Sequence, residues 1–291
     1  MKKLYQPKKK YHLKKLCYNP SIHLSEIDTS LITDMSGLFE GFDGNDEATS
    51  RDFEGIETWD VSNVKNMANM FSQSNFNHPI QSWNTGKVKN MAGMFSCTPF
   101  NQPIDSWNVG NVENMCYLFA YSNFNQPLHS WDVSKVKFMD AMFSNTPFNQ
   151  NINHWNIGEV LDLSFMFEDS DFNQCLDLWN TSNVRDMYAM FRNSPFNQPL
   201  HSWDVSNVEN MDEMFAFSKF NHPLNLWKLT AMREKPKDIF LDSDFQGSLD
   251  FLSTITLHQE KIYTLKKEWK NKLNTFMWKN RKKFIVKNLK H

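Results

Sequence analysis

The chain has 291 residues, of which 40% are hydrophobic and 22% charged, with only 9 Gly and 11 Pro. This composition excludes a collagen-like or wholly disordered chain, and the four cysteines lack the spacing of a disulfide framework or a structural metal site. The net charge of -2 conceals two basic ends and an acidic body, because residues 1–20 carry seven lysines and no acid, and residues 261–291 carry eleven Lys or Arg against Glu268 alone.

The N-terminal residues are basic and only partly apolar. Their positive charge is typical of a signal peptide, but no continuous apolar stretch follows it. Cys17 is also unlike a lipobox cysteine, because it is preceded by Leu16 and because Lys14 and Lys15 stand where a lipobox has small or apolar residues. The sequence therefore predicts no export signal and a short basic helix over residues 11–17. No apolar run approaches 18 residues, so we expect no transmembrane segment.

A degenerate repeat follows this N-terminal segment. In IDTSLITDMSGLF (residues 27–39) the apolar residues match those of the regular repeats downstream, and a Gly- and Asp-rich insertion follows in GFDGNDEATS. We therefore assign residues 1–58 to an N-terminal cap that contains a first, degenerate repeat with an insertion.

Residues 59–228 repeat with a period of 24. Phenylalanine, methionine, valine and asparagine recur in the same phase as tryptophan. The tryptophans are Trp59, Trp83, Trp107, Trp131, Trp155, Trp179, Trp203 and Trp227. A unit of this length cannot bury its large side chains alone, so we expect seven regular units that stack on one another.

Each unit contains two local patterns. In DVSNVKNMANMF, Val64, Met67, Met70 and Phe71 have helical spacing, which predicts a short helix. The following stretch, FNHPIQSW, contains Pro79 and predicts a short extended segment. The expected fold is thus an α/β repeat solenoid, similar to a leucine-rich repeat and capped at both ends.

The 24-residue repeat pattern ends after residue 228. An apolar stripe with spacings of three and four residues, formed by Ile262, Leu265, Trp269, Leu273 and Phe276, predicts an amphipathic helix rich in lysine. We assign residues 229–291 to a C-terminal cap. Its basic and aromatic residues are typical of a segment that binds nucleic acid or an anionic membrane, and attachment to the acidic repeats is the alternative.

The run FNQPLHSWDVSNVENMDEMF (residues 196–215), together with residues 27–39, resembles the BspA-like leucine-rich repeat proteins of bacterial surfaces. The resemblance covers about residues 20–228. It implies a role in adhesion and a protein partner on a host or cell surface, with localisation at the cell surface or outside the cell. The missing export signal leaves the cytoplasm as the alternative.

Two sets of residues are candidates for specific roles. Slots that vary between units hold large side chains where other units have small or polar ones, and these are our candidates for a protein interface: Tyr117, Tyr121, Phe165, Tyr188 and Phe217. A column of asparagines is expected to form a structural ladder between units: Asn77, Asn101, Asn125, Asn149, Asn173, Asn197 and Asn221.

Catalytic motifs are absent from the sequence. It has no nucleophile elbow, no glycine-rich phosphate loop and no HExxH pair, so we expect neither catalytic residues nor a bound metal or cofactor. The leading hypothesis is a non-catalytic module for protein–protein interaction or adhesion. The alternative is an intracellular protein that binds nucleic acid or anionic membrane through its basic ends.

Overall fold

The computed structural model describes residues 3–45 and 51–255, which belong to one compact unit, Met1–Thr256. These residues form one α-helix, α1 (Lys10–Cys17), and three 3-10 helices, η1 (Leu24–Glu26), η2 (Ile56–Thr58) and η3 (Asp250–Thr254). All other pairing of the described backbone in this unit is made by isolated parallel bridges and by turns.

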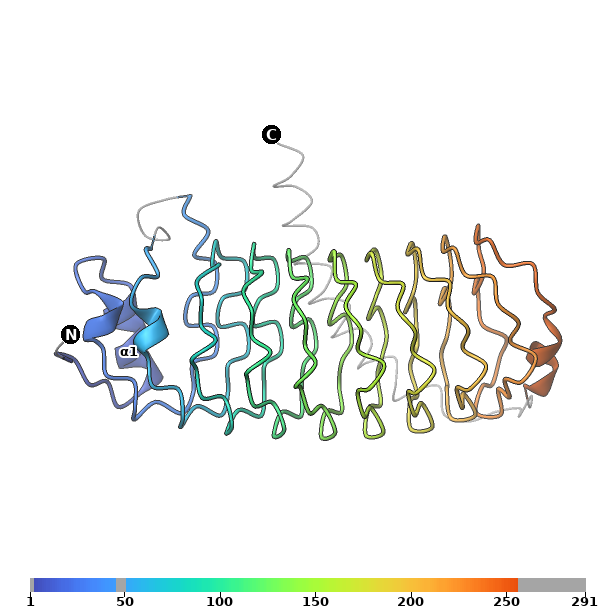
Figure 1. Cartoon of the computed structure of the whole chain (residues 1–291), viewed down its shortest axis with the longest axis horizontal. Coiled ribbons are helices and arrows are strands. Elements are labelled where there is room, and N and C mark those ends of the chain that lie inside the picture. The colour runs from blue at the N-terminus through green and yellow to red at the C-terminus, as the bar shows by residue number, and fades with distance from the viewer. Residues whose placement is uncertain (1–2, 46–50, 256–291) are drawn as a thin grey trace. The chain divides into compact units, whose positions relative to one another are not determined.

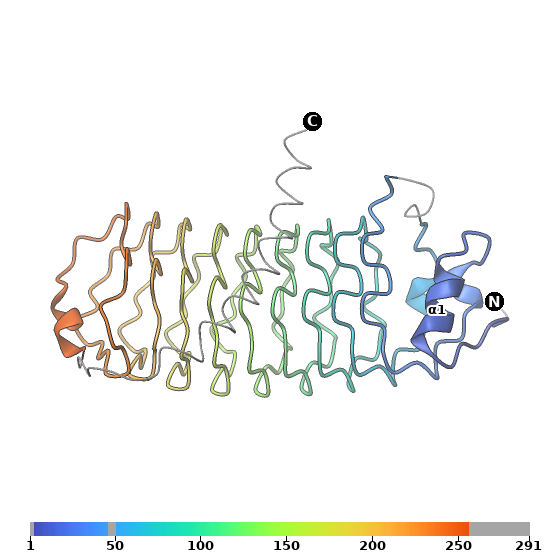
Figure 2. The same ribbon diagram turned by 180° about the vertical axis from the view of Figure 1, so that it is seen from behind.

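Each repeat forms one coil of a stack (Figures 1 and 2). One residue per coil makes a parallel bridge to the equivalent residue of the next coil, and this bridge position is occupied in turn by Asp34, Asn66, Asn90, Asn114, Phe138, Asp162, Asp186 and Asn210. We number the regular coils 1 to 7, each beginning at its tryptophan, from Trp59 to Trp203. The chain is therefore a repeat protein in which every coil contacts its two neighbours.

The predicted helix in each unit is wrong, because the structure has a series of turns there. In coil 1 the carbonyl groups of Met67, Asn69 and Phe71 each accept a hydrogen bond from the N–H three residues later, at 3.1–3.2 Å. Asn69 and Gln73 have positive φ values of 55° and 57°, which a right-handed helix excludes and a type II turn requires. We call residues 66–74 and their equivalents the turn segment.

Alternate N–H groups of the turn segment bond to the next coil instead of to their own. The N–H of Met67 donates to the carbonyl of Asn90 at 2.8 Å, and the N–H of Phe71 donates to Met94 at 3.0 Å. The same pattern continues through the regular coils. Because alternate N–H groups bond within their own coil and to the next coil, the segment completes neither the hydrogen bonds of a helix nor those of a longer strand.

The interior is a set of stacked side-chain columns that together form one hydrophobic core. The ring of Phe71 lies 3.6 Å from that of Phe76 in the same coil and 5.8 Å from that of Phe95 in the next, measured between centroids. Each repeat tryptophan from Trp59 to Trp227 is buried, and its indole N–H donates to a carbonyl of the preceding coil, as Trp107 does to Ile80 at 3.0 Å. The polar atom of every tryptophan in the core is thereby satisfied.

The segment that follows the turns, expected to be extended, makes its contacts between coils mainly through side chains. The Oδ1 atom of Asn77 accepts a hydrogen bond from the N–H of Asn101 at 3.0 Å and from Nε2 of Gln102 at 3.2 Å. The bond from the N–H of one asparagine to the Oδ1 of the previous one repeats along the column Asn77, Asn101, Asn125, Asn149, Asn173, Asn197 and Asn221.

Residues before the regular repeats close one end of the stack. Helix α1 buries Leu13 and Cys17, which are four residues apart and therefore lie on one face of the helix. Lys14 and Lys15 lie in its last turn, where they interact favourably with the helix dipole. The 27–58 coil and its insertion follow, and residues 46–50 of the insertion lie outside the described residues.

Stacking continues beyond residue 228, where the sequence pattern stops. Phe240 stacks on Phe215 with 5.6 Å between centroids, although 25 residues separate them in place of 24. Phe251, in η3, lies edge-on against Trp227 at 6.1 Å and covers the end of the tryptophan column. The predicted basic helix over residues 262–276 falls in 256–291, outside the described residues. In the described part of the chain, no helix is both long and apolar enough to span a bilayer.

Candidate interaction face

The side chains of the turn segments that lie between the buried methionine and phenylalanine columns recur along the stack, and some of them are buried while others are partly exposed. In coil 1 they are the side chains of Asn66, Ala68, Asn69, Ser72 and Gln73, and the equivalent slots recur in the other coils. We call this surface the turn face. Its slots vary from coil to coil, because the buried methionine and phenylalanine columns between them provide the packing.

The chemistry of the turn face changes abruptly between coils 2 and 3. In coils 1 and 2 every slot holds a small or neutral residue. In coils 3 to 7 the same slots hold six aromatic residues: Tyr117, Tyr121, Phe138, Phe165, Tyr188 and Phe217. They also hold seven acids, Asp140, Asp162, Glu168, Asp169, Asp186, Asp212 and Glu213, and one base, Arg192. We call this part of the turn face the aromatic–acidic strip.

All five interface candidates from the sequence lie on this strip. Phe217 is 47% exposed, and the other four are half-buried. The structure brings two of them into direct contact, since the ring of Phe165 lies edge-on to that of Tyr188 with 4.9 Å between centroids. Tyr117 and Tyr121 lie in coil 3 and Phe217 in coil 7, so the candidates are spread along the face and do not form one cluster.

Four of these aromatic residues occupy positions of positive φ. The values are 57° for Tyr117, 58° for Tyr121, 59° for Phe165 and 58° for Phe217. Glycine and asparagine adopt this left-handed conformation at low cost, whereas other residues pay roughly 1–2 kcal/mol. Coil 1 has Asn69 at the slot equivalent to Tyr117. The aromatic residues are therefore not there to satisfy the backbone.

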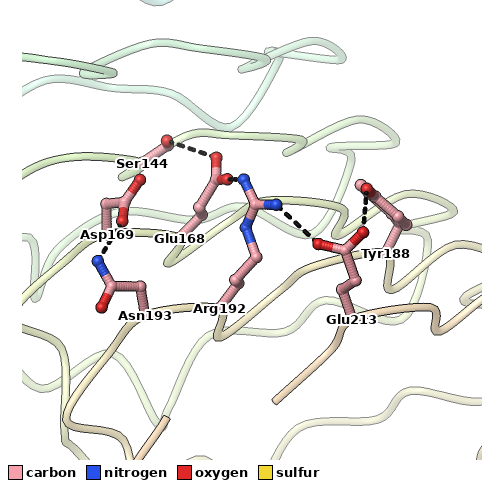
Figure 3. Close-up of polar contacts among 7 residues, drawn as sticks. All are labelled: Ser144, Glu168, Asp169, Tyr188, Arg192, Asn193 and Glu213. Atoms are coloured by element: carbon pink, nitrogen blue, oxygen red, sulfur yellow. Dashed lines mark hydrogen bonds and ion pairs between the residues drawn. The ribbon is translucent and has the colours of Figure 1, made fainter. Parts of the chain in front are cut away.

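A charged network holds the strip in coils 5 to 7 (Figure 3). The guanidinium of Arg192 lies between two carboxylates, bonded to Glu168, whose side chain is 3% exposed, and through Nη1 to Oε2 of Glu213 at 2.7 Å. The hydroxyl of Tyr188 donates to Oε1 of Glu213 at 3.0 Å, and Ser144 donates to Glu168 at 3.4 Å. The network fixes the ring of Tyr188 in place.

This environment also shifts the ionisation of the network. Burial, followed by the hydrogen bond and charge of Glu213, raises the pKa of Tyr188 to about 12. Burial alone would lower the pKa of Arg192, but the charges of Glu168 and Glu213 outweigh it and raise that pKa above its ordinary value. Arg192 is therefore a permanent cation that is shared between its two carboxylate partners.

Asp140 is a buried carboxyl for which no ion pair is found among the residues that the structure describes. It is 7% exposed, and burial, followed by the charge of Asp162, raises its pKa to about 7. Hydrogen bonds from the Cys116 thiol and from its own backbone N–H oppose this rise, and the charge of Asp186 adds to it. Burial also raises the pKa of Asp162, opposed by the N–H and hydroxyl of Ser164, which both donate to Oδ1 at 2.9 and 2.6 Å.

Several residues of the strip were missed by reasoning from the sequence. At the bridge position other coils have Asn or Asp, whose Oδ1 accepts the N–H two residues later, as Asn90 does from Ala92 at 3.0 Å. Phe138 has no such acceptor and is 37% exposed. This break in the column was the signal for Phe138, and Asp140 lies two residues after it.

Metal-binding chemistry finds no support in residues 3–45 and 51–255, where no group of three or more His, Cys, Asp or Glu is arranged to hold an ion. Glu168, an acid of the strip, is paired with Arg192.

Comparisons with known proteins place the chain in a family. No curated protein and no solved structure matches it. The family described as "Mycoplasma protein of unknown function, DUF285" matches three overlapping stretches, residues 10–96, 42–147 and 144–250, which together cover the N-terminal cap and the repeats. The chain belongs to this DUF285 family.

Proposed function

We propose that this repeat protein is a non-catalytic, leucine-rich-repeat-type solenoid that binds a protein partner through its aromatic–acidic strip. Adhesion at a bacterial surface, the role that the BspA-like resemblance implies, is the specific form of binding that we propose. The observation that carries the proposal is the contrast between coils 1 and 2 and coils 3 to 7 on one and the same face.

That contrast separates the demands of folding from those of binding. Coils 1 and 2 make the same turns and the same hydrogen bonds between coils as coils 3 to 7, but with small, neutral side chains outside. Folding thus needs neither aromatic residues nor acids at these slots. Their presence in coils 3 to 7, including aromatic residues at positive φ, runs against local backbone preference, and such positions are concentrated at functional sites.

The strip also has the properties of a binding surface. Tyrosine and arginine are enriched at the energetically dominant positions of protein interfaces. Tyr188 is held by Glu213 and by the ring of Phe165 before any partner arrives. A side chain that is already ordered loses little entropy on binding, so more of its contact energy contributes to affinity.

Site-specific crosslinking tests the proposal in cells that express the protein natively. Phe217, 47% exposed on the strip, is replaced by the photocrosslinker p-benzoylphenylalanine. The matched control carries the same crosslinker at Leu226, which belongs to the same coil, is 65% exposed and lies outside the turn face. A third protein combines the crosslinker at Phe217 with Tyr117→Asn and Phe165→Asn, since asparagine keeps the left-handed backbone.

The expected result is one protein crosslinked through position 217, not through position 226, and lost when Tyr117 and Phe165 are replaced. Equal labelling from both positions, labelling that survives the two asparagine substitutions, or no labelling from position 217 would overturn the proposal.

A further inference from the structure

We propose that the N-terminal end of the stack docks on an anionic phospholipid bilayer through the outer side of α1. The inference goes beyond the proposed function, because this contact lies on the N-terminal cap and its ligand is a lipid surface. Neither proposal depends on the other. We call Tyr11, Lys15 and Tyr18 the α1 stripe.

The α1 stripe lies opposite the buried side of the helix. Leu13 and Cys17 face the stack and are fully buried. Tyr11, Lys15 and Tyr18 follow one another at spacings of four and three residues, so they share the other side. Tyr11 is 63% exposed and Tyr18 44%, and Nζ of Lys15 lies 4.9 Å from the centroid of the Tyr11 ring. The outer side of α1 thus presents tyrosine rings and an ammonium group together.

The lysines of this end divide into those that the fold uses and those that it leaves at the surface. Lys10 forms an ion pair with Asp34 of the degenerate repeat at 3.5 Å. Three others are exposed, and no acid in the described part of the chain pairs with them: Lys8, Lys9 and Lys15. Their charges are therefore available to an anionic partner.

Tyrosine and lysine side by side fit the interface of an anionic bilayer. The tyrosine side chain has an apolar body and a polar tip, and it is enriched at the level of the lipid headgroups. Lysines near the surface are attracted by the negative headgroups. Residues 1–20 contain no arginine, the side chain whose planar fork reads bases and grips phosphates in nucleic-acid complexes. This composition favours a lipid surface over a nucleic acid.

The distribution of charge favours a flat partner that meets the stack end-on. The degenerate repeat bonds to the N-terminal segment on one side, through the bridge from Tyr5 to Ile27, and to coil 1 on the other, through the bridge from Asp34 to Asn66. Figure 1 shows α1 at the same end. The repeats beyond are acidic, but charges more than about 8 Å apart are largely screened from one another at physiological salt. An anionic surface therefore attracts the basic end without being repelled by the distant coils.

Photocrosslinking to lipid tests the contact at α1 itself, whatever the rest of the full chain contributes. Tyr11 is replaced by p-benzoylphenylalanine, and the protein is irradiated with vesicles of equal parts phosphatidylglycerol and phosphatidylcholine that carry a fluorescent phospholipid. The matched control has the crosslinker at Leu226, which is 65% exposed at the other end of the repeats. Vesicles of phosphatidylcholine alone are the uncharged reference.

Vesicle co-sedimentation of the full chain measures the contribution of the lysines. The test variant combines Lys8→Gln and Lys15→Gln. The control variant combines Lys65→Gln and Lys137→Gln, which removes two exposed lysines from the repeats. A lysine near an anionic membrane strengthens binding about fivefold, so the test variant should lose about 25-fold in partitioning and the control less than twofold. The melting temperature of each variant verifies that it is folded.

The expected crosslinking result is a lipid-labelled protein from position 11 with the anionic vesicles, and none from position 226 or with phosphatidylcholine alone. No lipid label from position 11, equal labelling in both kinds of vesicle, or equal losses in the two lysine variants would overturn the inference. A single-stranded oligonucleotide that loses affinity for the Lys8→Gln, Lys15→Gln chain while vesicle partitioning stays unchanged would overturn it as well, in favour of a nucleic acid.

Discussion

Replacing Asp140 by asparagine keeps the shape of a buried side chain and removes its charge, so the substitution should stabilise the protein at alkaline pH. The pKa of Asp140 is about 7 in the folded chain against an ordinary value of 3.8. Because the folded state binds the proton more tightly, stability is highest at low pH and falls as pH rises through this window. At ~1.4 kcal/mol per pKa unit, the ionised carboxyl destabilises the fold by about 4 kcal/mol at pH 8.

Urea unfolding followed by tryptophan fluorescence at pH 8, 6 and 4 measures this difference. Asp140→Asn should gain up to about 4 kcal/mol over the unsubstituted chain at pH 8 and less than about 1 kcal/mol at pH 4, where the aspartate is protonated in the folded chain and partly protonated in the unfolded chain. Glu159→Gln, at an exposed position, should show no comparable trend. A gain that does not depend on pH, or no gain at pH 8, would refute the assignment of a buried, uncompensated charge.

Three further substitutions test other features of the structure. Asn149→Ala removes an Oδ1 that accepts hydrogen bonds from a backbone N–H of the next coil at 2.9 Å and from a glutamine amide at 3.1 Å. The free energy of unfolding should therefore drop by about 1–3 kcal/mol, and an unchanged melting temperature would argue against the asparagine ladder. Arg192→Met removes the cation that is paired with the buried carboxylate of Glu168 and should destabilise by about 3 kcal/mol in urea titrations, and adding Glu168→Ala should restore most of the loss; no recovery in the double variant would contradict this. Phe217→Asn replaces an exposed phenylalanine at φ 58° by a residue that adopts this left-handed conformation at lower cost, so the free energy of unfolding should rise by about 0.5–1 kcal/mol. A lower melting temperature would show that the aromatic ring packs on the fold.

The period of 24 and the buried columns follow from the sequence, but the local backbone does not. Met67, Met70 and Phe71 are spaced as on a helix because successive turns of three and four residues also return side chains to one side. The decisive residues are Asn69 and Gln73, whose positive φ ends any helix. Asparagine or glycine recurs at these two slots in several coils, but the aromatic residues in other coils hide the pattern.

The candidate site was predictable only as a set of variable slots. Tyr117, Phe165 and Phe217 stand out because equivalent slots in other units are small. The pairing of Arg192 with Glu168 and the burial of Asp140 depend on contacts between coils, 24 residues apart, whose direction across the stack the sequence does not specify. The sequence does not show which of its many acids is buried, and only a buried acid stands out as a candidate functional residue.

The neutral turn face of coils 1 and 2 has a consequence for how such proteins diversify. Those coils separate α1 from the aromatic–acidic strip, and each contributes one layer of the phenylalanine stack, with 5.8 Å between the rings of Phe71 and Phe95. Because a coil bonds only to its two neighbours, unequal recombination that adds or deletes one whole unit there leaves every remaining register intact. Descendants of one ancestral gene can thus present an unaltered aromatic–acidic strip at different distances from α1.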